Sequence, residues 1–299
     1  MQDDCISIVL PTYKRPKILR RALKSILDQT YSKWECIVVD DDPKSSAKSV
    51  LDIYNDDRLR YVSHNTNRGV SAARNTGLEH STYSLVSFLD DDDEWLPKKL
   101  ELQAEKFTKV RSSVGLVYCW MEWVSSENVF KYTRTSLSGN IFDRTLDSQP
   151  LGNISTWLVS KDAALEVGGF DESLPRGNDG DFLRKITRQY EVDYVPQVLV
   201  RYHVDHGNKR ITRSDVSGIR NAIKGQKVKL DKFSHELSKL PLQKSRIYAR
   251  IAFRYGQLRD WRNCLKYFQR ALWSHPLSLE TYLYVARLFL SAVLNKHSE

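Results

Sequence analysis

Four consecutive aspartates, Asp90 to Asp93, directly follow an apolar stretch at residues 85–89. Carboxylates this close together repel one another, and burying them without partners is costly. A divalent cation such as Mg²⁺ or Mn²⁺ removes that cost, because it takes oxygen ligands and can bridge to phosphates. Along the chain no basic residue follows the run until Lys98, which favours a metal site over an exposed acidic loop.

Two further pairs of acids stand where chemistry is possible. Asp40 and Asp41 close a second apolar stretch, where a carboxylate either accepts a hydrogen bond from a nucleobase or simply caps a turn before Pro43. Asp179 and Asp181 lie where a glycine-containing loop enters a predicted helix. There an aspartate either caps the helix or acts as a general base that deprotonates an acceptor hydroxyl.

Strand-like and helix-like segments alternate through the first 125 residues, and residues 126–212 are less regular. Alternation of this kind is typical of a largely parallel sheet with helices on both faces, in which ligands bind beyond the carboxyl ends of the strands. The predicted class is therefore α/β, with a helical extension at the C-terminus. The predicted strands are residues 6–10, 36–39, 59–62, 85–89, 114–120, 154–159 and 197–202, and the predicted helices are residues 16–29, 70–80 and 181–190.

The net charge of +9 is concentrated in the last part of the chain. Residues 213–299 hold 17 Lys+Arg against 6 Asp+Glu, a net of +11, which leaves 29 basic and 31 acidic residues in 1–212, a net of −2. We therefore predict two domains, 1–212 and a basic helical tail at 213–299. Such asymmetry indicates an anionic partner, for example a membrane surface or a nucleic acid, unless the charges only solvate a helical surface.

The tail also carries a 34-residue helix-turn-helix pattern, and it resembles about one and a half tetratricopeptide repeats. A generic helical hairpin is the alternative. Because fewer than three repeats rarely fold alone, we expect the tail to pack on the first domain, and it is a candidate surface for a protein partner. The positions that fit the pattern are Tyr248, Ile251, Ala252, Tyr255, Phe268, Ala271 and Pro276, followed by Tyr282, Val285, Ala286 and Phe289.

Several features favour a cytoplasmic protein. No apolar run approaches the roughly 18 to 20 residues that a membrane-spanning helix needs, and the N-terminus has acids where a signal peptide carries basic residues. The four cysteines lie far apart, which indicates free thiols rather than a disulfide framework or a thiolate metal site. Nucleic acid is not an expected partner, because most tail aromatics fall on helical core spacing.

Five blocks, in this order and spacing, resemble family 2 glycosyltransferases, which have the GT-A fold. The resemblance covers roughly residues 4–212 and implies that fold for the first domain. The blocks are residues 8–15 (Ile-Val-Leu-Pro-Thr-Tyr-Lys-Arg), 27–41 (from Leu-Asp-Gln-Thr-Tyr to Val-Val-Asp-Asp), 67–75 (Asn-Arg-Gly-Val-Ser-Ala-Ala-Arg-Asn), 88–95 (the DxD segment) and 168–179 (Gly-Gly-Phe-Asp-Glu to Asn-Asp).

The resemblance implies roles for individual residues. Asp90 and Asp92 are the ends of the DxD motif, with Asp92 the direct metal ligand, and Asp91 lies near the ribose. Arg74 lies near the base or the diphosphate. The residues implied at the nucleotide base are Pro11, Thr12, Tyr13, Asp40 and Asp41, with Tyr13 stacked on the base.

Other implied roles concern the acceptor and the late loop. Asp179 is the general base; the acid that precedes it in the family is replaced by Asn178, and Asp181 is the fallback base. His203 or His206 reaches the diphosphate or the metal, or either is a plain surface residue. The residues expected on the acceptor side are Trp157 and Arg176.

The implied activity is metal-dependent, inverting transfer of a sugar from a nucleotide sugar, by family habit a UDP-sugar. The acceptor is a hydroxyl of a saccharide or a lipid-linked saccharide in cell-surface glycan synthesis, and the cofactor is Mn²⁺ or Mg²⁺. Transfer to a polyprenyl phosphate and a non-catalytic tetratricopeptide-like scaffold are the alternatives. The basic tail leads us to expect peripheral association with the inner face of the cell membrane.

Overall fold

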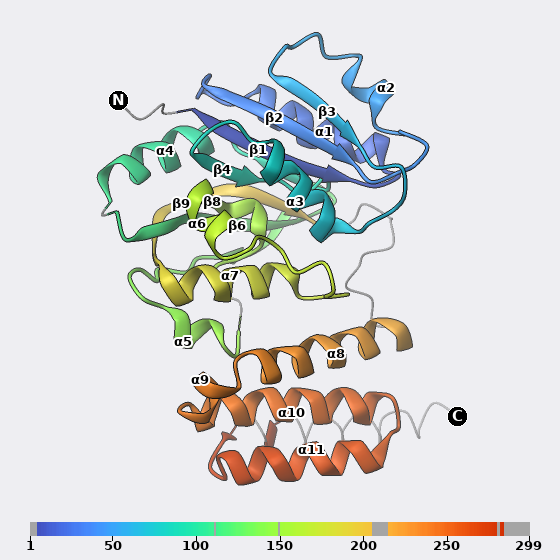
Figure 1. Ribbon diagram of the computed structural model, residues 1–299, viewed down its shortest axis with the longest axis vertical. Coiled ribbons are helices and arrows are strands. Elements are labelled where there is room, and N and C mark those ends of the chain that lie inside the picture. Colours follow the sequence, from blue (N-terminus) through green and yellow to red (C-terminus); the bar gives the residue numbers. More distant parts are fainter. Residues whose placement is uncertain (1–4, 111, 149, 205–214, 280–281, 284–299) are drawn as a thin grey trace. The chain divides into compact units, whose positions relative to one another are not determined.

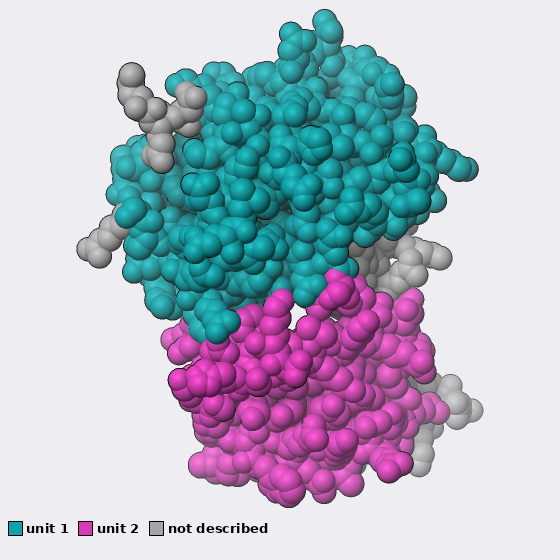
Figure 2. All heavy atoms as spheres, viewed as in Figure 1, with its two compact units in different colours: residues 1–142, 149–172, 178–207 teal, residues 143–148, 173–177, 208–299 magenta. Residues whose placement is uncertain are grey.

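The computed structural model describes residues 5–110, 112–148, 150–204, 215–279 and 282–283. Within these ranges the chain divides into two compact units (Figure 2). Unit 1 contains residues 1–142, 149–172 and 178–207, and unit 2 contains residues 143–148, 173–177 and 208–299. The expected domain boundary at 212/213 lies outside the described residues.

Four parallel strands form the first half of the sheet of unit 1, in the order β3-β2-β1-β4 (Figure 1). Their carboxyl ends meet at one edge, so the residues that follow Thr12, Asp40 and Phe88 are brought together. The parallel arrangement that the alternating pattern predicts is confirmed here. The strands are β1 (Ile6–Thr12), β2 (Trp34–Asp40), β3 (Leu59–Ser63) and β4 (Leu85–Phe88).

The second half of the sheet has mixed directions. β8 runs antiparallel to both β4 and β6, β9 runs parallel to β6, and β5 and β7 pair antiparallel with β9 and β6. The short strand β5 begins inside the aspartate run, which fixes the end of that run to the sheet. These strands are β5 (Asp93–Trp95), β6 (Val114–Ser125), β7 (Asn128–Thr133), β8 (Trp157–Ser160) and β9 (Glu191–His203).

Helices cover both faces of the sheet, because strand residues alternate between two cores. Ile8 and Leu10 of β1 pack in one hydrophobic cluster, and Val9 between them packs in the other. The helices with residues in the first cluster are α1 (Pro16–Leu27), α2 (Lys48–Leu51) and α4 (Lys99–Lys109). Those in the second are α3 (Val70–His80), α6 (Lys161–Glu166) and α7 (Asn178–Gln189).

Some predicted elements differ from the observed ones. The predicted strand at 154–159 is wrong in its first half: Ile154–Thr156 forms a 3-10 turn (η1), because Thr156 N and Oγ1 both bond to the Asn153 carbonyl. β9 begins at Glu191, before the predicted 197, and α7 begins at Asn178, before the predicted 181. Strand β5 was not predicted, because its three residues carry no hydrophobic alternation.

The regular elements among the described residues of unit 2 are all helices, as predicted. Helices α10 and α11 lie side by side as a hairpin, with Tyr267 of α11 stacked on Tyr255 of α10 at 5.6 Å between ring centroids (Figure 1). No helix within the described ranges combines the length and the apolar composition that crossing a bilayer requires. The unit contains α8 (Val216–Lys232), α9 (Ser234–Ser238), α10 (Pro241–Gln257), α11 (Trp261–Ser274) and most of the short helix α5 (Phe142–Thr145).

Candidate active site

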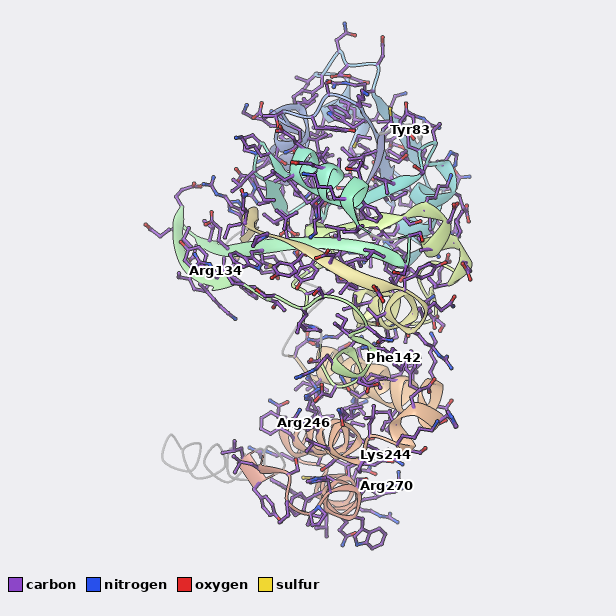
Figure 3. The ribbon with its side chains drawn as sticks, turned by 90° about the vertical axis from the view of Figure 1, so that its left-hand side faces the viewer. Tyr83, Arg134, Phe142, Lys244, Arg246 and Arg270 are labelled. Carbon is purple, nitrogen blue, oxygen red and sulfur yellow. The ribbon has the colours of Figure 1, made fainter. Side chains whose placement is uncertain are left out.

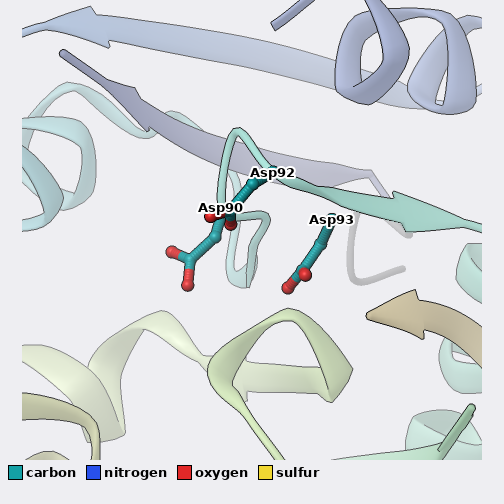
Figure 4. Close-up of side chains that lie close together, drawn as sticks. All are labelled: Asp90, Asp92 and Asp93. Atoms are coloured by element: carbon teal, nitrogen blue, oxygen red, sulfur yellow. The ribbon is translucent and has the colours of Figure 1, made fainter. Parts of the chain in front are cut away.

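Three aspartates gather in the loop between β4 and β5. Asp90, Asp92 and Asp93 each place a carboxylate oxygen within 4.8 Å of the others. Figure 4 shows the three side chains. The Asp93 amide donates to the Asp90 carbonyl at 3.0 Å, a turn that folds the run back on itself. The loop therefore presents a compact set of oxygen donors, as a divalent cation site requires.

Asp93, which the DxD spacing passes over, is the most deeply placed of the three. Its Oδ2 accepts hydrogen bonds from Ser155 Oγ and Asn153 Nδ2, each at 2.5 Å, while Oδ1 is buried and has no partner among the described residues. Burial, then the charges of Asp92 and Asp90, raises the pKa of Asp93 well above its usual value, against the two hydrogen bonds. Ser155 Oγ also accepts from the Asp90 amide at 3.1 Å, so this serine fixes two members of the cluster.

Asp91 points away from the cluster, toward the end of β1. Thr12 Oγ1 donates to it at 2.8 Å and Arg15 at 3.1 Å. Burial, and then the charge of Asp92, raises the pKa of Asp91 to about 7, although Arg15 and Thr12 oppose the shift. Asp91 is thus a carboxyl group that changes its charge near neutral pH.

The aspartate run has basic neighbours after all, so the expectation drawn from the distance to Lys98 is wrong. Arg15 also donates to Asp92 Oδ2 at 3.1 Å, and Arg21 donates to the Asp92 carbonyl at 2.8 Å. Both arginines come from the segment after β1, which the parallel sheet brings beside the run. Sequence reasoning missed them because it searched only the local sequence; a basic residue just beyond a neighbouring strand end was the available signal.

Arg74 links the aspartate loop to α7. Its side chain is buried and donates to Asp90 Oδ1 and to Asp179 Oδ1, each at 2.6 Å. Burial alone would lower the pKa of Arg74, but the two carboxylates outweigh it and raise the value. Burial likewise raises the pKa of Asp179, against the opposing charge of Arg74. Asp179 is therefore a carboxylate with increased proton affinity, held in place from α3.

The acids after β2 are occupied by bonds within the protein. Asp40 has no exposed surface and accepts from the Ala47 amide at 2.8 Å and from Tyr61 Oη at 3.0 Å. Asp41 accepts from the Gly69 amide at 2.8 Å; Gly69 has a φ of +89°, which a side chain would disfavour at the start of α3. Asp41 also accepts a hydrogen bond from the Arg68 amide and bonds to His64 Nδ1.

The remaining nucleotide-side residues lie at the end of β1. Pro11 is buried within the strand, opposite Val39 of β2. Tyr13 follows the strand and is 39% exposed, and Lys14 Nζ lies 4.9 Å from its ring centroid. The exposed ring of Tyr13, at the strand end next to Asp40 and Asp41, is a suitable surface for stacking an aromatic base.

Neither His203 nor Asp181 belongs to the aspartate cluster found within the described residues. His203 Nε2 bonds to Glu94 Oε2 at 2.9 Å, and this bond is the main cause of a lowered Glu94 pKa. His206 lies outside the described residues. Asp181 is buried in the first turn of α7.

The two residues expected on the acceptor side have different surroundings. Trp157 is fully buried in the core, where it stacks on Phe182 at 6.5 Å between centroids, so it has a packing role and no surface for an acceptor in this structure. A tryptophan in an apolar strand is more simply explained by packing. Arg176 belongs to unit 2 and donates to the Gly218 carbonyl at 3.2 Å.

Comparison with known proteins gives this geometry a family. The model of glycosyl transferase family 2 matches residues 7–157, which include the aspartate loop. The chain is 30% identical to the Escherichia coli UDP-Glc:alpha-D-GlcNAc-diphosphoundecaprenol beta-1,3-glucosyltransferase WfgD over 129 residues, 43% of this chain and half the length of that protein. It is also 30% identical over 240 residues to WcaA of Escherichia coli K12, a putative colanic acid biosynthesis glycosyl transferase, covering 77% of this chain and 84% of that one.

Solved structures show the same fold. TarS 1–349 of S. aureus, crystallised with UDP-GlcNAc, aligns with a TM-score of 0.65 at 16% identity, over 89% of this chain and 81% of that chain. The match to its complex with UDP has a TM-score of 0.58 at 17% identity, over 93% and 91%. The family model spans half of the chain, and WcaA is matched over most of both sequences. These matches show that the chain belongs to glycosyl transferase family 2 and is a glycosyltransferase.

Proposed function

We propose that this protein transfers a sugar from a UDP-sugar to a hydroxyl group of a lipid-linked saccharide, with a divalent cation held by the aspartate loop. The observation that carries the proposal is the cluster of Asp90, Asp92 and Asp93, in which Asp93 Oδ1 is buried without a hydrogen-bond partner among the described residues. An ionised carboxylate that is buried with an unpartnered oxygen is costly, and a bound cation removes that cost.

The three residues fit a hard cation such as Mn²⁺ or Mg²⁺, since all their donor atoms are oxygens and two of the carboxylates are partly exposed. When bound, the cation supplies Lewis-acid neutralisation of the negative charge on the leaving diphosphate. The protein's own contribution is to hold these oxygens still. Ser155 and Asn153 do so for Asp93, and Arg74 does so for Asp90.

A UDP-sugar donor is supported by two relatives. TarS was crystallised with UDP-GlcNAc, and the printed name of WfgD gives UDP-Glc as its donor. In this chain Tyr13 offers an exposed ring for the uracil, while Thr12 and Asp41 lie at the adjoining strand ends. Binding the base at these strand ends places the diphosphate toward the aspartate loop.

Asp179 is the proposed general base. Its raised pKa gives it the proton affinity to draw the hydrogen from an acceptor hydroxyl as that oxygen attacks the anomeric carbon. Attack from the side opposite the leaving diphosphate inverts the anomeric centre. Arg74 orients the Asp179 carboxylate, and holding donor and acceptor in line supplies much of the remaining rate enhancement.

A sugar hydroxyl is favoured over a polyprenyl phosphate as the acceptor. WfgD is named for forming a beta-1,3 bond to GlcNAc carried on diphosphoundecaprenol, and WcaA for colanic acid biosynthesis. The name of WfgD thus describes a bond from one sugar to another. We therefore place this enzyme in glycan synthesis on a lipid carrier, with Mn²⁺ or Mg²⁺ as cofactor.

The test is release of UDP from a panel of UDP-sugars with and without Mn²⁺, preceded by a thermal-shift screen in which the true donor raises the melting temperature. We expect release that a chelator and Asp92→Ala both abolish. Asp57→Ala, which removes an exposed aspartate elsewhere in unit 1, is the matched control and should release UDP normally. Equal release with and without chelator would show that the proposed cation role is wrong.

A further inference from the structure

Helix α11 of unit 2 is anchored through one face. Tyr267 and Ala271 are buried against α10, with Tyr267 stacked on Tyr255, and Ser245 Oγ donates to the Ala271 carbonyl at 2.8 Å. An aspartate at its N-terminus, Asp260, caps the helix by accepting from the Asn263 amide. The contacts of Tyr267 and Ala271 with α10 thus lie on one side of α11.

The opposite face of α11 exposes large apolar side chains. Trp261 is 56% exposed, Leu265 is 58% exposed and Trp273 is 87% exposed. These positions are separated by four and eight residues, so all three point from one side of the helix. Leu277 and Leu279, just after the helix, are also exposed. The exposed Gln269 lies between Leu265 and Trp273 in this row. Exposed tryptophan and leucine side chains gathered on one side of a helix indicate a site of interaction.

Basic side chains run beside this apolar row. Arg262, Lys266 and Arg270 are exposed and also repeat every four residues, and α11 contains no acidic residue. Among the described residues none of the three forms an ion pair with a carboxylate. Residues 241–274 as a whole contain eight Lys+Arg and a single acid, Asp260. Figure 3 shows Lys244 and Arg246 on α10 and Arg270 on α11.

We propose that the outward face of α11, formed by Trp261, Leu265, Trp273, Arg262, Lys266 and Arg270, binds an anionic lipid bilayer. Tryptophan and leucine side chains enter the boundary between headgroups and acyl chains, while neighbouring arginine and lysine side chains pair with lipid phosphates. Leucine and tryptophan side chains among cations match the structure of an anionic bilayer, in which negatively charged headgroups cover apolar acyl chains. The proposal rests on the proposed function, since a lipid-linked acceptor lies in a membrane.

A nucleic acid would satisfy the charges of this surface but not Leu265, because base stacking uses flat aromatic rings. A second protein would need acids to match three adjacent cations around an apolar row. An anionic bilayer matches both the apolar and the basic side chains of this face. Binding to it would also bring the enzyme to the membrane in which the proposed acceptor is anchored.

The test is sedimentation of the full chain with vesicles of phosphatidylcholine containing phosphatidylglycerol, compared with phosphatidylcholine alone. The wild type should bind only the anionic vesicles, and binding should fall as salt is raised. The triple variant Arg262→Gln, Lys266→Gln, Arg270→Gln should bind about a hundredfold more weakly, from roughly 0.7 of a decade per cation. The matched control is Arg220→Gln, Lys224→Gln, Lys239→Gln, which removes three exposed charges elsewhere in unit 2 and should bind as the wild type does.

A second variant, Trp261→Gln with Trp273→Gln, tests insertion itself. Brominated lipids should quench the tryptophan fluorescence of the wild type and quench this variant markedly less. Equal vesicle binding by the wild type and both α11 variants overturns the proposal, as does binding of the wild type to generic DNA but not to vesicles. Failure of the wild type to bind anionic vesicles would overturn it as well.

The assay separates this inference from the proposed function. UDP release in solution uses only unit 1 residues, so the α11 variants should release UDP from the donor at the wild-type rate. Loss of vesicle binding with normal release would confirm the lipid surface alone. Vesicle binding by a wild type that releases no UDP from any donor would refute the proposed function and leave the lipid surface standing.

Discussion

Arg74 and Asp179 meet at 2.6 Å although 105 positions separate them in the sequence. The same guanidinium holds Asp90 at 2.6 Å, so one buried cation connects a carboxylate of the aspartate loop to the carboxylate at the start of α7. A change at Arg74 therefore reaches both the cation site and the general base that we propose.

Replacing Arg74 with methionine should cost both stability and activity. The variant leaves Asp90 and Asp179 without their shared counter-charge, which we expect to lower the free energy of unfolding by about 2 kcal/mol, less than for a fully buried pair because both carboxylates are partly exposed. Urea unfolding measures this. Lys24→Met, which breaks the exposed pair with Asp28, should change stability by less than about 0.5 kcal/mol. Equal effects of the two substitutions would contradict the structural role of Arg74.

Replacing Asp179 with asparagine should lower kcat by about 10² to 10⁴ if Asp179 is the base. The raised pKa of Asp179 also predicts a pH profile for the wild type: the group must be deprotonated to act, so kcat/KM should fall as pH drops through a value above that of an ordinary aspartate. Arg74→Met should move this acid limb to higher pH, because the opposing positive charge is gone. An acid limb that does not move would show that another group is titrating.

Replacing Ser155 with alanine should weaken cation binding without removing a ligand. Ser155 donates to the Asp93 carboxylate and accepts from the Asp90 backbone amide, so its loss loosens one ligand carboxylate and the backbone that carries another. Changes of this kind typically reduce metal affinity by about 10- to 100-fold. A titration of activity against Mn²⁺ should show a raised half-saturation, with kcat recovered at high Mn²⁺. Ser112→Ala, at an exposed serine after α4, is the control.

Replacing Lys99 with methionine should remove a pH dependence of stability. Lys99 is fully buried, donates to Ser87 Oγ at 2.9 Å and lies 3.9 Å from the Trp95 ring centroid, and burial lowers its pKa to about 7. Between pH 7 and about 10 the unfolded chain binds a proton at this lysine that the folded chain does not, so stability should rise with pH in that window.

The measurement for Lys99 is urea unfolding at pH 7, 8.5 and 10. The rise should be smaller in Lys99→Met than in the wild type, while the neighbouring exposed Lys98→Met keeps it. Asp91 should give a pH dependence of stability with the opposite sign. Its pKa of about 7 means that the folded chain holds a proton at Asp91 more tightly than the unfolded chain does, so the free energy of unfolding falls as pH rises from about 4 to 7. Identical slopes in all three proteins would refute the assignment to Lys99.

Local patterns predicted the first half of the fold well. The predicted helix at 70–80 matches α3, and the predicted strands at 59–62 and 85–89 match β3 and β4 to within a residue. These elements bury regular apolar rows, which is what periodicity measures. The placement of Asp90 and Asp92 at the carboxyl end of β4 was also predicted, because the aspartate run directly follows an apolar stretch.

The rest depended on contacts between distant residues. Nothing near Asp90 in the sequence indicates Arg74 as its partner, and nothing near Asp93 indicates Ser155, which lies 62 positions away. The 3-10 turn that places Ser155 forms because Thr156 satisfies the backbone locally, against the apolar pattern of Ile154 and Trp157. Sequence periodicity reports burial, and it does not report which polar groups meet.

Strand β5 has a consequence for the kind of ion that the protein accepts. Asp93 offers a carboxylate oxygen to the cation site, and its backbone also pairs with Tyr202 of β9 in the sheet. Moving the three carboxylates apart to fit a larger ion would disturb the pairing between β5 and β9. The spacing of the carboxylates is therefore restrained by the sheet. Small ions with bonds near 2.1 Å fit such a frame better than calcium, whose bonds reach about 2.3 to 2.6 Å.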